Sequence, residues 1–273
     1  MEAKKLSTGG QEIAYYESEG TGPAVMLIHG NSASSLTFQA QVEGELGQNY
    51  RVVAIDLPGH GESDRAADPA ATYHMPGYAA VAAEVAQKLN LEEAVVGGWS
   101  LGGHIALEMV KMMPNAAGFV IFGTPPLAFP PDMDNAFLPN PAMAAAFAEE
   151  LTPEQMEGFA AACLAPDTTL DLAPFVADIA RTDGRARATM AGSIAPDGYE
   201  DEVEIVKTMT RPLAVLHGEH EQLVNAEYIS ALEMPTLWRG AVQIIEGAGH
   251  TPQTETPEKF SELVAAFVED VTG

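Results

Sequence analysis

A serine framed by glycines is the first feature of the sequence that could carry out chemistry. The segment "AVVGGWSLGG" places Ser100 in the pattern Gly98-x-Ser100-x-Gly102, after an apolar strand-like run and before a helix-like run. This strand–turn–helix context is typical of a nucleophile elbow, in which a sharp, strained turn exposes the serine hydroxyl. Glycine at both flanking positions keeps side chains out of the turn. We predict Ser100 as a nucleophile; the alternative is a serine without a role in a glycine-rich turn.

A serine nucleophile needs a general base, and His250 is the histidine best placed for it. Enzymes built around such an elbow carry an acid and then a histidine further along the chain. Only His217, His220 and His250 follow Ser100 far enough along. His250 lies between the last strand-like run and the last helix, in a loop at the same sheet edge as Ser100, whereas His217 lies inside a strand. We assign no catalytic role to His29, His60 or His104.

The base in turn needs a carboxylate that fixes its tautomer and stabilises the imidazolium ion. This acid should follow the strand "LAVLHG", where the loop reads "EHEQLV" and offers Glu219 and Glu221. We favour Glu221, which is further from the strand end. Glu219 remains an alternative, as do Asp132 and Asp134 after the preceding strand.

The reaction also needs two hydrogen-bond donors where a tetrahedral oxyanion would form. The backbone N–H of Leu101, directly after the nucleophile, is one candidate. Asn31 in the loop "HGNSASS" is the other, and its side chain is also a candidate substrate contact. The chain has neither the H-E-x-x-H spacing of a hydrolytic metal site nor a helix-opening G-x-G-x-x-G dinucleotide motif. We therefore expect no metal and no cofactor.

The elements that must position these residues alternate between strands and helices. Continuous apolar runs suit strands that are buried on both faces of a parallel sheet, and they occur at 23–30, 51–59, 94–100, 118–124, 213–219 and 242–250. Helical apolar stripes separate them, and the last helix is expected to begin at a Thr256 cap followed by proline. The pattern predicts a doubly wound, mostly parallel α/β sheet with an N-terminal antiparallel hairpin.

The alternation stops after the sixth strand, where residues 125–210 read as several short helices. We predict a helical cap inserted at 125–210 into a core formed by 1–124 and 211–273. One cap helix begins with a capping box, Thr152 with Gln155. Ligands bind at the carboxyl ends of the strands in open α/β sheets, so the cap is expected to cover the site. Phe159 in the cap and Trp99 beside the nucleophile are candidate substrate contacts; the alternative is a core aromatic, which such residues more often are.

Composition limits the partners. The chain of 273 residues carries 39 acidic and 13 basic residues, a formal net charge of −26, and it lacks the basic clusters that meet nucleic-acid phosphates. Cys163 is the one cysteine, which fits a reducing compartment. We see no signal-peptide core and no long apolar run. We therefore expect a cytoplasmic protein, a monomer or weak homo-oligomer, that meets a small molecule rather than nucleic acid or a membrane.

Five motifs taken in order resemble the α/β-hydrolase superfamily: "HGNSASS", "DLPGHGESD", "GGWSLGGH", "LHGEHE" and "GAGHTPQTETPEKF". The resemblance covers nearly the whole chain outside the cap. A serine at the elbow sets the chain apart from the branch with an aspartate nucleophile, which includes haloalkane dehalogenases and epoxide hydrolases. Most relatives use aspartate where this chain has Glu221. Within the superfamily, the combination of Ser100, His250 and a glutamate acid resembles the metal-independent N-acyl-homoserine lactonases. Asn31 directly after the His-Gly pair is a second feature similar to those enzymes.

This resemblance implies a serine hydrolase that opens the ring of N-acyl-homoserine lactones, the signals of bacterial quorum sensing. It implies Ser100 as nucleophile, His250 as base and Glu221 as acid, with Asn31 and Leu101 as oxyanion donors. Carboxylesterases and carbon–carbon bond hydrolases of the same fold share every motif and remain alternatives. A ligand-binding module that has kept the fold without catalysis is the alternative of another class.

Overall fold

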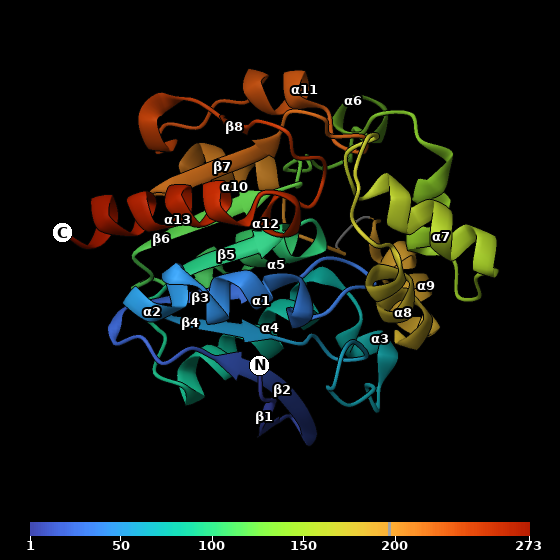
Figure 1. Ribbon diagram of the computed structural model, residues 1–273, viewed down its shortest axis with the longest axis horizontal. Helices are drawn as coiled ribbons and strands as arrows, with labels where there is room; N and C mark the ends of the chain where they lie inside the picture. Colours follow the sequence, from blue (N-terminus) through green and yellow to red (C-terminus); the bar gives the residue numbers. More distant parts are fainter. Residues whose placement is uncertain (196–197) are drawn as a thin grey trace.

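An eight-stranded, mostly parallel sheet forms the centre of the computed structural model, which describes residues 1–195 and 198–273 (Figure 1). The strand order is β1-β2-β4-β3-β5-β6-β7-β8. The first two strands form the expected antiparallel hairpin, β2 is antiparallel to β4, and the later strands run parallel. The strands are β1 (Lys4–Thr8), β2 (Gln11–Glu17), β3 (Gly22–Ile28), β4 (Tyr50–Ile55), β5 (Val95–Trp99), β6 (Gly118–Phe122), β7 (Leu213–Gly218) and β8 (Gln243–Ile245).

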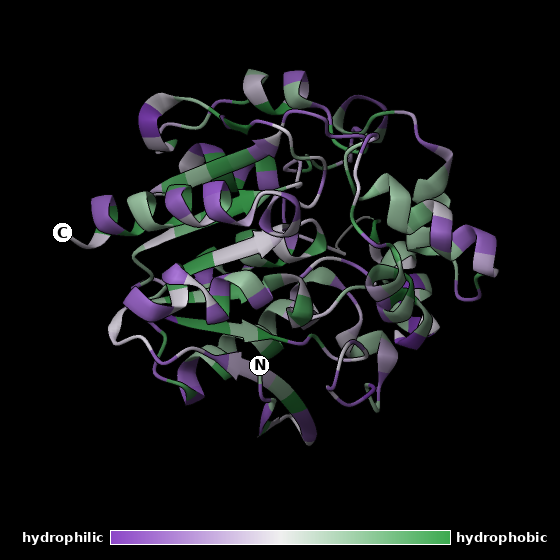
Figure 2. Ribbon diagram, in the orientation of Figure 1, coloured by the Kyte–Doolittle hydropathy of each residue, from purple (hydrophilic) through white to green (hydrophobic). Residues whose placement is uncertain are grey.

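The sheet is covered by helices on both faces, as continuous apolar strands require. In β3, Met26 and Ile28 face one hydrophobic cluster, while Val25 and Leu27 face the other. Figure 2 shows hydrophobic residues along the central strands, whereas covering helices such as α13 mix polar and apolar turns. This arrangement confirms the doubly wound, mostly parallel α/β sheet that the strand and helix patterns predicted.

The helices of the core are α1 (Gln39–Glu43), α2 (Glu45–Asn49), α3 (Pro69–Thr72), α4 (Met75–Lys88), α5 (Leu101–Glu108), α11 (Ala226–Ala231), α12 (Pro252–Glu255) and α13 (Pro257–Thr272). Short 3-10 turns, η1 (Ser35–Phe38), η2 (Met109–Lys111) and η4 (Trp238–Gly240), join them. Helix α13 begins at Pro257 as expected, but the Thr256 side chain does not cap it. Its hydroxyl instead donates to the Pro252 carbonyl at 3.3 Å.

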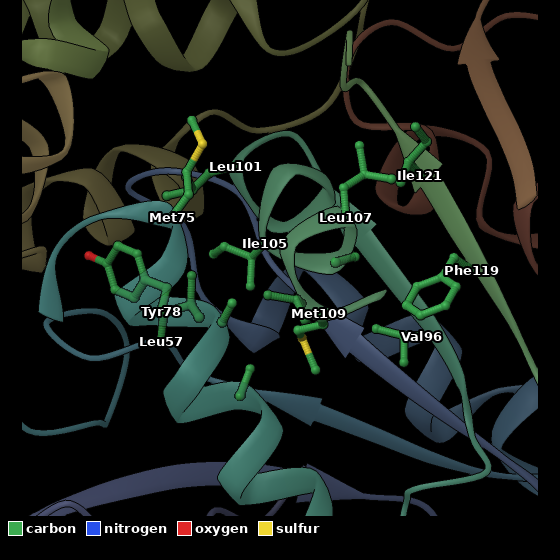
Figure 3. Packing of buried hydrophobic residues seen from close by; sticks show 14 of the residues in the cluster. Leu57, Met75, Tyr78, Val96, Leu101, Ile105, Leu107, Met109, Phe119 and Ile121 are labelled. Atoms are coloured by element: carbon green, nitrogen blue, oxygen red, sulfur yellow. The ribbon is translucent and has the colours of Figure 1, made fainter. Parts of the chain in front are cut away.

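Helix α5, which follows Ser100, is buried along its whole length between the sheet and α4. Figure 3 shows Ile105 of α5, and Met109 directly after it, in one cluster with Tyr78 of α4 and with Val96 and Phe119 of the sheet. Burying side chains of this size contributes about 1.5–3 kcal/mol each. The helix that follows Ser100 is therefore held firmly by packing.

The segment between β6 and β7 supplies α6 (Met133–Ala136), η3 (Pro141–Phe147), α7 (Pro153–Ala162), α8 (Ala173–Arg181), α9 (Gly184–Ser193) and α10 (Glu202–Thr208). Helices α7, α8 and α9 gather beyond the carboxyl ends of the strands (Figure 1), where the cap was expected. The capping box of Thr152 and Gln155 is present at the start of α7. Helix α10 differs, because it packs beside α5 in the core.

Candidate active site

The turn at Ser100 is strained in the way that a nucleophile elbow requires. Ser100 lies between β5 and α5 with φ 53° and ψ −118°, a region that costs a non-glycine residue about 1–3 kcal/mol. A Cβ atom on Gly98 would lie 2.0 Å from the Gly102 carbonyl oxygen, and one on Gly102 would lie 2.1 Å from the Ile28 carbonyl oxygen. Both positions must be glycine for the turn to close.

His250 and Glu221 form a buried pair next to this turn. The His250 Nδ1 lies 2.8 Å from Glu221 Oε2, and both side chains are almost fully buried. The other carboxylate oxygen accepts the Leu223 N–H at 2.8 Å. Burial alone would raise the pKa of Glu221, but the attraction and hydrogen bond of His250 outweigh it, and the pKa lies below its usual value. Glu221 is therefore charged at neutral pH.

The other candidate acids lie elsewhere. The Glu219 carboxylate is half exposed, accepts the Gly247 N–H at 3.0 Å and lies 3.5 Å from His220 Nε2. Asp132 accepts a hydrogen bond from the Asn135 side chain at 2.8 Å. Of the acids considered from the sequence, Glu221 is the one whose carboxylate lies within hydrogen-bond distance of His250.

The loop that carries His250 is fixed by the last residue of β5 and by the residue that follows β6. The Trp99 indole N–H donates to the His250 carbonyl oxygen at 2.7 Å, and the two rings lie 5.6 Å apart. Gly123, at the end of β6 with φ 58°, approaches so closely that a Cβ atom there would lie 2.8 Å from His250 Cε1. These contacts leave the imidazole little freedom to move.

One cavity connects the residues singled out in the sequence. Its walls include Asn31, Trp99, Ser100, Leu101, Phe159 and His250, and Glu221 lies behind His250. The cap supplies most of the remaining wall through apolar side chains, including Met143, Phe147, Met190 and Ile194. The structure therefore brings all seven predicted site residues together.

Asn31 lines this cavity, and its side chain makes a contact with the cap that the sequence did not reveal. Its side-chain NH₂ donates to the Ala146 carbonyl in the cap at 2.7 Å, and its side-chain oxygen accepts from Ser32 Oγ at 3.0 Å. The side chain thus joins the loop to the cap. Within residues 1–195 and 198–273, the backbone N–H groups of Asn31 and Leu101 have no backbone acceptor, which leaves both free as donors.

His29 orients the Asn31 N–H through the preceding peptide. The His29 Nε2 accepts the Leu57 N–H at 3.0 Å, so its proton resides on Nδ1, which donates to the Gly30 carbonyl at 2.7 Å. That carbonyl shares a planar peptide with the Asn31 N–H, and fixing one fixes the other. Burial lowers the pKa of His29 to about 4, so the ring is neutral at pH 7.

His104 is the cavity residue that reasoning from the sequence passed over. No catalytic role is assigned to it from the sequence, yet its ring lines the cavity and its Nδ1 lies 2.8 Å from a fully buried carboxylate, that of Glu202. Its position four residues after Ser100 places both on one helix face, which was the available signal. In the described part of the chain, no group of three or more His, Cys, Asp or Glu side chains could hold a metal ion.

The fold and this site define an α/β hydrolase. The model of the alpha/beta hydrolase family matches residues 25–263, and the chain belongs to that family. Its relatives include a lactonase and methyl ester esterases. None of the helices in the described residues is long and apolar enough to span a membrane.

Solved structures confirm the resemblance to N-acyl-homoserine lactonases. The chain is 39% identical to the N-acyl homoserine lactonase AidH complexed with N-butanoyl homoserine, with a TM-score of 0.95 over 100% of this chain and 98% of that chain. It is equally similar to an AidH mutant complexed with N-hexanoyl homoserine lactone, with a TM-score of 0.95 over 100% and 99%.

Curated proteins extend the comparison to esterases. A pimeloyl-(acyl-carrier protein) methyl ester esterase of Xanthomonas campestris pv. campestris is 30% identical over 257 residues, which cover 91% of this chain and 96% of the esterase. An uncharacterized protein of Mycobacterium tuberculosis is 38% identical over 95 residues, and the match spans only 27% of that protein's length.

Proposed function

We propose that the protein opens the lactone ring of N-acyl-homoserine lactones through an acyl-enzyme intermediate and thereby quenches quorum-sensing signals. The observation that carries the proposal is the buried Glu221–His250 pair, which lies beside Ser100 in a cavity walled by apolar cap residues. The similarity to AidH over the whole chain supports the choice of substrate.

In the first half of the reaction, Ser100 Oγ attacks the lactone carbonyl carbon while His250 Nε2 takes the serine proton. The negative charge that develops on the carbonyl oxygen is held by the backbone N–H groups of Leu101 and Asn31. The ring C–O bond then breaks, and His250 returns the proton to the leaving ring oxygen. The product of this half-reaction is an ester between Ser100 and the opened acyl-homoserine.

In the second half, a water molecule attacks the ester carbonyl and His250 takes its proton. Collapse of the tetrahedral intermediate releases the Ser100 oxygen, which regains a proton from His250, and frees N-acyl-homoserine as a carboxylic acid. Glu221 stays charged throughout; it keeps the Nδ1 proton in place and stabilises the imidazolium ion that forms twice in each cycle.

The cap would select the acyl chain. Its contribution to the cavity wall is dominated by Phe and Met side chains, which suit an alkyl chain because binding pockets are largely apolar with a few polar groups for orientation. Phe159 and Trp99 line both this cavity and a second apolar cavity of about 300 Å³ beside α7 and α8. A longer chain could extend toward that space.

The deciding experiment compares kcat/KM on a panel of N-acyl-homoserine lactones with short aryl esters and a ring-fission product of aromatic degradation. We expect lactones to be the best substrates in a pH-stat assay, without loss of rate in the presence of a chelator. A rate on lactones hundreds of times lower than on aryl esters would contradict the proposal. Ser100→Ala should abolish turnover while substrate binding persists.

A carboxylesterase acting on small esters is the second candidate, which the 30% identity to the Xanthomonas methyl ester esterase favours. The same panel separates the two functions. Labelling with a serine-directed phosphonate addresses the remaining possibility of a binding module, since an intact protein with no adduct on Ser100 would rule out the enzyme mechanism.

A further inference from the structure

A second histidine–glutamate pair lies in the wall of the catalytic cavity. His104 on α5 contacts Glu202 on α10, with its Nδ1 2.8 and 2.9 Å from the two carboxylate oxygens. Both residues are buried, and Glu202 has no exposed surface at all. An ionisable pair is costly to bury, so its presence beside an active site calls for a role.

Glu202 fixes the state of the His104 ring. One of its oxygens also accepts the Leu127 N–H at 2.7 Å, while the Glu202 N–H donates to the Leu127 carbonyl at 2.9 Å, so the carboxylate cannot turn. A carboxylate accepts hydrogen bonds and does not donate them, and the neutral imidazole therefore carries its proton on Nδ1. Its Nε2 keeps a lone pair, since among the described residues the side-chain hydrogen bonds of His104 are made through Nδ1.

The position of His104 relates this lone pair to the nucleophile. His104 follows Ser100 by one helical turn, and its backbone N–H donates to the Ser100 carbonyl at 3.3 Å. Side chains on a helix lean toward its N-terminus, so the ring leans back toward Ser100. When Ser100 attacks a carbonyl carbon, the substituents on the adjacent carbon of the substrate would lie near the His104 ring.

An N-acyl-homoserine lactone carries an amide on the carbon adjacent to its scissile carbonyl. We propose that His104 is a substrate-positioning residue whose Nε2 accepts a hydrogen bond from this amide N–H, and that Glu202 holds it in the accepting tautomer. The inference rests on the proposed lactonase function and deepens it, because it explains how a cavity with mainly apolar walls distinguishes an acylamino lactone from a simple ester.

The test uses two lactones of matched length: N-hexanoyl-homoserine lactone and a γ-butyrolactone with an alkyl chain in place of the acylamino group. His104→Leu should lower kcat/KM for the first by about tenfold, the value of one neutral hydrogen bond at the upper end of its range, and leave the second nearly unchanged. His104→Gln, which keeps a hydrogen-bonding group, should recover part of the loss.

Glu202→Gln tests the tautomer. The Leu127 N–H would hold the remaining oxygen of the new side chain, so its NH₂ group would face Nδ1 and move the ring proton to Nε2. The ring could then no longer accept the amide N–H, and we expect the same selective loss as in His104→Leu. His220→Leu is the matched control: His220 lies outside the cavity and is half exposed, and the rates on both lactones should stay within about twofold.

The outcomes separate the two proposals. Equal losses on both lactones in His104→Leu and His104→Gln, with a lowered Tm, would show that the pair only supports the fold and would overturn the positioning role. If the wild-type enzyme hydrolyses aryl esters but neither lactone, the lactonase function itself fails and this inference fails with it. If His104→Leu does not fold, the comparison rests on His104→Gln and Glu202→Gln.

Discussion

Trp99 donates its indole N–H to the backbone carbonyl of His250 at 2.7 Å, so the residue before Ser100 holds the loop that carries His250, the proposed base. Trp99→Phe keeps the aromatic contact and removes this donor. We expect a loss of about 1–3 kcal/mol in the free energy of unfolding, because a buried carbonyl is left without a partner. Urea denaturation would measure it. The less constrained base should also lower kcat more than it raises KM, and an unchanged kcat would show that the hydrogen bond does not align the base.

Glu221→Gln tests the charge of the acid while keeping its shape. The amide cannot stabilise the imidazolium ion and can hold His250 in the wrong tautomer, which in a comparable triad lowers kcat by about 10⁴. We expect a fall of about three orders of magnitude or more in kcat for lactone hydrolysis. Glu219→Gln is the matched control. The half-exposed Glu219 carboxylate contacts the Gly247 N–H and His220 rather than His250, so removing its charge should change kcat little.

Glu221 should also make stability depend on pH in the acidic range. Its pKa in the folded protein is held below the usual value by His250, so its stabilising effect is complete above the unfolded pKa of about 4.3 and is lost as pH falls through the lower folded pKa. The stability of the wild-type protein should therefore rise with pH in this window. Glu221→Gln should show a weaker dependence there, and parallel curves from urea titrations of the two proteins would contradict this expectation.

The elbow turn, the position of His250 and the sheet could be predicted because their signals are local. Ser100 has its glycines within two residues, and His250 follows a recognisable strand. The choice between Glu219 and Glu221 remained open because both follow the same strand, and only the hydrogen bond to His250 separates them. A loop's register cannot be read from residue types alone.

The missed features depend on residues that are distant in the sequence. Asn31 contacts Ala146 in the cap, and His104 contacts Glu202 on a helix that was assigned to the cap but packs in the core. Neither partner is marked by a motif, because each is defined by packing between segments about a hundred residues apart. The sequence could therefore place the chemistry at one sheet edge without showing how the cap is attached to it.

Gly98→Ala should destabilise the protein severely, because the added methyl group would lie 2.0 Å from the Gly102 carbonyl oxygen and backbone atoms would have to move. We expect a loss of about 3 kcal/mol or more, or no folded protein. Gly158→Ala is the matched control. Gly158 lies inside α7 with open space around it, so alanine should stabilise the protein by up to about 1 kcal/mol. Thermal unfolding would compare the Tm values of the two variants. Similar Tm values would show that the elbow is not constrained as described.

Asn31→Ala separates the two functions of that residue. The backbone N–H, the proposed oxyanion donor, remains, while the side-chain hydrogen bond to the Ala146 carbonyl is lost. We expect KM to rise by several-fold, because the cap is held less firmly over the substrate, with a smaller effect on kcat.

His29→Ala should lower kcat more than it raises KM, because it removes the donor that orients the Gly30–Asn31 peptide. We expect kcat to fall by about ten- to a hundredfold, which is less than the 10²–10³ cost of losing one oxyanion donor entirely. If both variants changed the same parameter, the division between side chain and backbone would be wrong.

Phe159→Leu should change the preference for acyl-chain length. Phe159 is buried and lines both the catalytic cavity and the second apolar cavity, which is also walled by Phe175 and Ile179. A smaller side chain opens the partition between them, so long alkyl chains gain apolar surface to bury, at about 0.8 kcal/mol for each additional CH₂ group covered. Short chains end before the partition and only lose a contact. The ratio of kcat/KM for dodecanoyl- over butanoyl-homoserine lactone should therefore rise in Phe159→Leu, whereas Phe175→Leu, which changes only the far wall of the second cavity, should leave the rate on the butanoyl substrate unaltered. A ratio that stays constant in Phe159→Leu would show that the acyl chain takes another path through the cap.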